Sequence, residues 1–115
     1  MACDVRVASP AARFAITPAK FGISYPQADV RRLVALVGAG QAARLLLSAE
    51  SIDGTEAARI GLVELCVEGA VAEAERLARS MAANDPDWGL AATPVYDDLT
   101  LGVALEGLRV LELGA

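Results

Sequence analysis

The feature that most constrains this sequence is a helical repeat of apolar residues that begins near Asp29. Apolar residues recur there at positions i, i+3, i+4 and i+7, which places their side chains on one face of a helix. They are Val30, Leu33, Val34 and Val37. Gly38 follows and is placed to end the helix. A second such run, from Gln41 to Ala49, comes after so short a connection that we expect two neighbouring helices packed together.

Short strands are expected on both sides of these helices. Residues 3–8 alternate apolar and polar side chains and end at a Ser-Pro pair, because proline cannot continue a hydrogen-bond ladder. Residues 13–16 form a second short extended segment, and residues 62–67 a buried strand. The stretch between Phe21 and Pro26 is expected to be a loop.

Two further helices and a tail complete the pattern. Asp53 and Glu56 have the spacing of a capping box, and Gly61 supplies a stop, so residues 53–60 should be helical. An apolar stripe over 71–81 predicts another helix, which ends near Asn84. Residues 108–113 are typical of a strand. We therefore expect one main unit over residues 1–92 and a separate tail over 93–115.

Several classes of function are disfavoured by composition. The chain has no histidine, the commonest general base and metal ligand, so we expect no metal site. A net charge of −5 offers no basic surface for nucleic acid. Cys3 and Cys66 have no zinc-ligand spacing and no disulfide framework, which favours a reducing cytoplasm. We expect no membrane segment, because no stretch of about 20 apolar residues occurs.

A series of short motifs carries a family resemblance. The motifs are Ala2 to Ala8 (ACDVRVA), Ala12 to Phe14, Gly22-Ile23, Arg32-Leu33, Leu36 to Gly38, Leu45 to Ser48, Ile52-Asp53 and Glu56 to Val63. In this order and spacing they resemble the second half of the enoyl-CoA hydratase/isomerase (crotonase) family, over residues 2 to about 86.

The resemblance implies an α/β chain with an incomplete crotonase-like (ClpP/crotonase) fold: a helix-rich C-terminal portion with a few short strands. It implies chemistry on an acyl-CoA thioester through an enolate held by two backbone amides, with no cofactor besides the coenzyme A of the substrate. Both amides belong to segments upstream of Ala2, so we expect a truncated chain that is inactive alone. Whether it is itself an enzyme stays open. Complete members assemble as homotrimers or hexamers, and the tail weakly resembles the opening strand of family III CoA-transferases.

The resemblance also suggests site residues. Hydratases of the family carry a glutamate at the position matching Pro18, and proline cannot transfer a proton. The run from Phe14 to Tyr25 is instead similar to the methylmalonyl-CoA decarboxylase branch, which has a Thr-Pro-Ala run and a tyrosine eight residues after the threonine. The implied catalytic residues are Thr17 and Tyr25, and the implied substrate-binding residues are Pro18, Phe21, Gly22 and Ile23.

Plainer interpretations remain for several of these residues. The hydroxyl of Thr17 could bind a backbone group in a turn, and Tyr25 could be a packed aromatic residue. Asp29 could be an active-site carboxylate, but it also suits a helix start. Glu64 and Glu68 are expected to face solvent. For the whole chain, the alternative is a non-catalytic oligomerisation module or a pseudoenzyme remnant.

Overall fold

The computed structural model describes residues 3–84 and 110–113. The predicted boundary near residue 92 lies outside these residues. The elements, in order, are β1 (Val5–Ala8), β2 (Arg13–Phe14), the 3-10 helix η1 (Pro18–Phe21), α1 (Gln27–Ser48), β3 (Ile52–Asp53), α2 (Gly54–Ile60), β4 (Leu65–Cys66), α3 (Ala70–Ala82) and β5 (Val110–Leu113).

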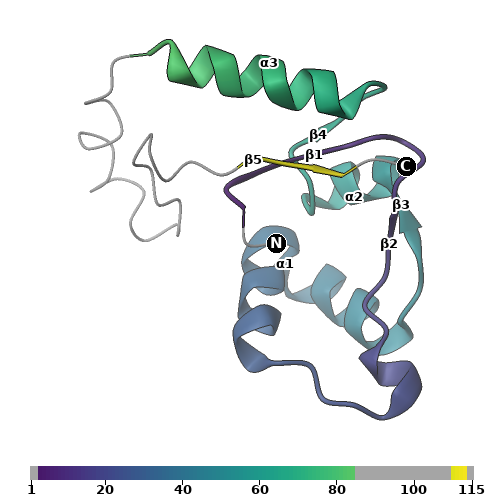
Figure 1. Ribbon diagram of the computed structural model, residues 1–115. Helices are drawn as coiled ribbons and strands as arrows, with labels where there is room; N and C mark the ends of the chain where they lie inside the picture. Colours follow the sequence, from purple (N-terminus) through teal and green to yellow (C-terminus); the bar gives the residue numbers. More distant parts are fainter. Residues whose placement is uncertain (1–2, 85–109, 114–115) are drawn as a thin grey trace.

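A three-stranded parallel sheet in the order β4-β1-β5 lies at the centre of the described residues. Figure 1 shows α3 on one side of this sheet, and α2 with α1 beyond it on the other. Successive residues of β1 therefore enter different cores, because strand side chains alternate between faces. Val7 packs with Ala70 and Ala74 of α3, whereas Ala8 belongs to the larger core formed with α1 and α2.

Helix α1 largely confirms the predicted helical pair. Gly38 has φ 82° and ψ 164°, a conformation outside the helical region that glycine adopts readily, and it kinks the element between its two halves. The predicted start was wrong by two residues, because α1 begins at Gln27. Asp29 consequently lies inside the first turn, where its charge still favours the amide end of the helix dipole.

The capping of α2 is confirmed for one of its two acidic residues. The Asp53 carboxylate accepts a hydrogen bond from the Glu56 amide at 2.8 Å. The Glu56 carboxylate does not return to the helix start but binds the guanidinium groups of Arg59 and Arg44. These hydrogen bonds, first that of Arg59 and then that of Arg44, lower the pKa of Glu56 to about 2.

Strand β4 is much shorter than the predicted strand over 62–67. The amides of Leu62 and Val63 both donate to the carbonyl of Ala57, at 2.8 and 3.3 Å, and so close the C-terminal end of α2. These two residues are buried but belong to a turn. The apolar run therefore predicted the burial of Leu62 and Val63 correctly. Its prediction of a strand there was wrong, because their backbone amides bind the end of α2. In the tail, residues 110–113 of the predicted strand are confirmed as β5.

Candidate functional site

The predicted site residues lie on the segment that connects β2 to α1. Thr17 stands directly before η1, and its carbonyl accepts a hydrogen bond from the Lys20 amide at 2.9 Å. The carbonyl of Pro18 accepts from the Ile23 amide at 3.1 Å, which folds the chain back after η1. Gly22 makes this turn with φ 65°, in the left-handed region that favours glycine. The predicted loop over 21–26 is thus partly helical at its start.

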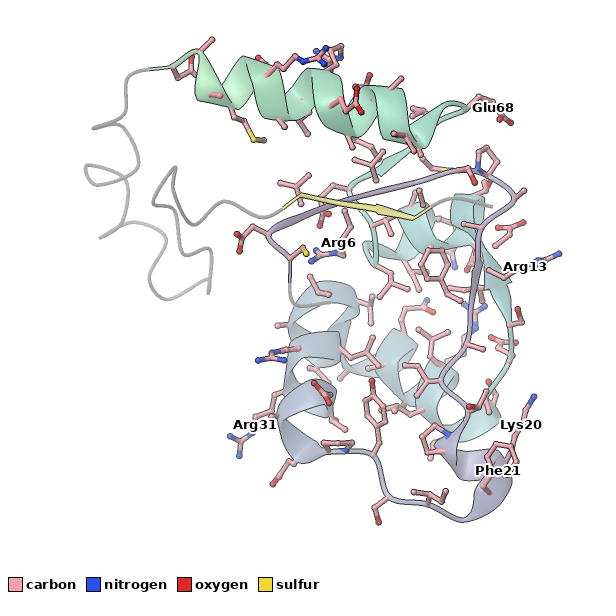
Figure 2. All side chains as sticks on the ribbon, in the orientation of Figure 1. Arg6, Arg13, Lys20, Phe21, Arg31 and Glu68 are labelled. Atoms are coloured by element: carbon pink, nitrogen blue, oxygen red, sulfur yellow. The ribbon has the colours of Figure 1, made fainter. Side chains whose placement is uncertain are left out.

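Two large apolar side chains of this segment are exposed. Phe21 is 71% exposed and Ile23 is 64% exposed. Figure 2 shows Phe21 and Lys20 on the part of the molecule that lies farthest from α3. Single exposed apolar residues are ordinary, but these two lie only two positions apart on one tight turn.

Within residues 3–84 and 110–113, no side-chain hydrogen bond is seen for the Thr17 hydroxyl or the Tyr25 hydroxyl. The Thr17 side chain makes no capping hydrogen bond to η1, so its expected role in a turn is not observed. Tyr25 is half-buried just before α1, and no side-chain hydrogen bond among the described residues joins it to Thr17. Burial raises the pKa of the Tyr25 phenol, and the negative charge of Asp29 adds to this effect. Tyr25 is therefore a protonated hydrogen-bond donor at neutral pH.

The pKa of Tyr25 gives a testable prediction. Replacing Asp29 with asparagine removes the nearby negative charge, so the pKa of Tyr25 should fall toward the ordinary value of 10.0. Absorbance titration in a Tyr96→Phe background would follow Tyr25 alone. Because the folded-state pKa is raised, this group contributes stability below pH ~10, and the contribution is lost as pH rises through the folded pKa. Glu68→Gln is the control, and an equal shift in both variants would contradict the assignment.

A buried arginine, which sequence reasoning treated as an ordinary strand residue, organises the start of β1. Arg6 is 4% exposed, and its Nε donates to the carbonyl of Leu62 at 2.9 Å. Its two terminal nitrogens donate to the Cys3 carbonyl and to the Glu64 carboxylate. Glu64 is exposed as predicted, but its carboxylate also accepts from the Arg6 amide at 2.6 Å. No pattern in the sequence signalled this cluster, because strand alternation alone does not locate its partners.

No group of three or more histidine, cysteine or acidic residues within 3–84 and 110–113 is arranged to hold a metal ion. Among the helices of the same ranges, none is both long enough and apolar enough to span a membrane.

The fold just described agrees with comparisons against known proteins. Residues 1–95 match the family model described as Enoyl-CoA hydratase/isomerase, and the chain belongs to that family. Crotonase-fold neighbours cover most of the chain, which confirms the predicted incomplete α/β fold.

Individual relatives show how much of the domain is present. The chain is 39% identical over 88 residues to a short-chain-enoyl-CoA hydratase of Clostridium acetobutylicum, covering 75% of this chain and 34% of that protein. A hydratase of the same name from Clostridioides difficile is 38% identical over 86 residues, with coverages of 73% and 56%. A putative enoyl-CoA hydratase/isomerase family structure from Hyphomonas neptunium superposes with a TM-score of 0.72 at 36% identity, covering 83% of this chain and 37% of that one. The chain thus spans between a third and somewhat over half of these proteins.

Proposed function

We propose that this chain forms part of an acyl-CoA site in which residues 17–25 make the wall that contacts the acyl group. The proposal rests mainly on two exposed apolar side chains, Phe21 and Ile23, that lie on one turn just before the half-buried, protonated Tyr25. An apolar surface with one or two placed polar groups is the usual composition of a small-molecule site. Membership of the enoyl-CoA hydratase/isomerase family supports an acyl-CoA thioester as the substrate.

The chemistry that this segment favours is decarboxylation through an enolate. Residues 17–25 contain no carboxylate, and Pro18 stands at the position that the family resemblance assigns to a glutamate, so the segment offers no carboxylate base. Thr17 and Tyr25 instead offer two hydroxyl donors that suit a substrate carboxylate. When carbon dioxide leaves, the bonding electron pair remains as the enolate, which a proton from solvent then quenches. This step needs desolvation and a held oxyanion more than a base.

We further propose that the 115-residue chain binds such thioesters without turning them over. The chain covers 34% and 56% of the two clostridial hydratases. The family resemblance implies that the amides that hold the enolate oxygen belong to segments upstream of Ala2, and this implication supports the proposal. As in complete members, a homotrimer or hexamer is the proposed assembly of that whole domain.

Isothermal titration of the chain with propionyl-CoA, and with free CoA as control, tests the acyl wall. Phe21→Ala should weaken propionyl-CoA binding by roughly ten-fold, because losing contact with one apolar side chain costs about 1.5 kcal/mol. Val71→Ala is the matched control, since Val71 is 54% exposed on α3, away from the segment. Absence of saturable binding, or equal losses in both variants, would reject the proposed wall.

A second arm of the same titration tests the decarboxylase assignment. Thr17→Val and Tyr25→Phe should weaken methylmalonyl-CoA binding and leave propionyl-CoA binding unchanged, because only the first ligand carries the carboxylate that the hydroxyls would contact. Turnover of methylmalonyl-CoA by the chain alone would refute the proposed incompleteness. Equal effects on both ligands would refute the carboxylate contact.

The alternative function, a non-catalytic oligomerisation module, has one observation in its favour. Leu47 and Val34 of α1 are 81% and 38% exposed, as expected of a helix that meets another subunit. Sedimentation separates the two functions: a stable oligomer that binds no acyl-CoA supports the module, whereas a monomer at high concentration removes it.

A further inference from the structure

The two long edges of β1 have different partners. On one edge, the carbonyl of Arg6 accepts from the Glu64 amide at 3.0 Å and the carbonyl of Ala8 accepts from the Val67 amide at 2.9 Å. Successive residues of a strand direct their backbone groups to opposite edges. The amides and carbonyls of Val5 and Val7 therefore point to the other edge.

Strand β5 lies along that other edge. It pairs in parallel with β1 over its whole length, from Val5 opposite Val110 to Ala8 opposite Leu113. Figure 1 shows the two strands side by side, with α3 above them. Val7 is fully buried, with 0% exposure, so its backbone groups have no water to bind and require a protein partner. Strand β5 supplies it.

Strand β5 lies outside the part of the chain that matches the family, because the match ends at residue 95 and β5 begins at Val110. We propose that the edge of β1 opposite β4 is a strand-acceptor surface, and that residues 110–113 are a built-in strand that occupies it. The tail thereby acts as an intramolecular complement to the family-matched part. An extended apolar segment from elsewhere can bind to this edge only by displacing β5.

The register identifies which backbone groups of β5 make the ladder. Leu111 lies opposite Arg6, and the backbone amide and carbonyl of Arg6 point to β4. The amide and carbonyl of Leu111 therefore form hydrogen bonds with the backbones of Val5 and Val7, on either side of Arg6. The amide of Glu112 points away from β1, and β5 is last in the strand order. Proline is tolerated where an edge-strand amide faces outward and is disruptive where the amide is in the ladder.

Amide hydrogen exchange on the full chain tests the proposal with a pair of neighbouring substitutions. Leu111→Pro should speed exchange of the Val7 amide by about ten-fold or more, because the strand that covers it is released. Glu112→Pro should leave that amide protected. The proposal is overturned if Leu111→Pro leaves Val7 protected, or if both variants lose protection equally, since the effect would then not follow the ladder.

Rescue in trans tests whether the edge accepts a strand. A synthetic peptide of residues 106–115, added at about millimolar concentration to match a tethered segment, should restore protection of the Val7 amide in the Leu111→Pro chain. The same peptide carrying proline in place of leucine at position 111 should not. Failure of the unaltered peptide to restore protection would show that the edge is not a strand acceptor.

Discussion

Replacing Gly54 with alanine is expected to destabilise the fold by about 3 kcal/mol, the upper part of the range for overpacked sites. An added Cβ at this position would lie 1.9 Å from the carbonyl oxygen of Ser9 and 2.9 Å from its carbon. Both are backbone atoms, so no side-chain rotation relieves the clash. The Gly54 amide also donates to the carbonyl of Pro10 at 3.2 Å, which holds α2 against the turn after β1.

Chemical denaturation followed by circular dichroism would measure this effect, with Gly40→Ala as the matched control. Gly40 lies within α1, and a Cβ there would meet nothing within 4 Å. Alanine at this site should stabilise the helix by about 0.5 to 1 kcal/mol, because it reduces the entropy lost on folding. Two Gly-to-Ala changes should thus have opposite signs. A loss below about 1 kcal/mol for Gly54→Ala would contradict the close approach of α2 to Ser9.

Replacing Arg6 with alanine is expected to cost about 3 kcal/mol, near the lower end of values for breaking a buried ion pair. The substitution leaves the carbonyls of Leu62 and Cys3 and the Glu64 carboxylate without their shared donor. The Glu64 side chain is 37% exposed, so water recovers part of the loss at that partner. Because Arg6 joins β1 to the turn that precedes β4, the free energy of unfolding of the whole sheet should fall.

The control for Arg6 is an arginine whose ion pair is exposed and local. Arg76 pairs with Glu73 within α3 and its side chain is 64% exposed, so Arg76→Ala should change stability by no more than about 0.5 kcal/mol. The double variant Arg6→Ala/Glu64→Ala should lose less than the sum of its single changes, because both remove the same interaction. Additive losses would show that the two side chains do not act on each other.

Much of the local structure was predictable because it depends on neighbours along the chain. The helical stripe of α3, the cap at Asp53 and the kink at Gly38 each follow from residues a few positions apart. The errors arose where a group had more than one possible partner. The Glu56 carboxylate binds Arg59 and Arg44 in place of the helix start, and the amides of Leu62 and Val63 bind the end of α2 in place of a strand.

The candidate site follows the same division. The sequence and its family resemblance led to the segment 17–25 and to the eight-residue separation of Thr17 and Tyr25. The exposure of Phe21 and the effect of Asp29 on the pKa of Tyr25 depend on how η1 and α1 fold around the segment. The roles of Thr17, Tyr25 and the substrate-binding residues stay predictions.

The sequence by itself therefore determined the order of the three α-helices and of β1, β2, β4 and β5, though not η1 or β3. It also determined membership of the enoyl-CoA hydratase/isomerase family, because local periodicity and motif spacing carry both kinds of information. Only the tertiary structure decided that Arg6 is buried among three acceptors, that Gly54 must stay glycine, and that β5 covers the open edge of β1. Each of these joins segments more than 40 residues apart, and contacts at that separation depend on packing and register.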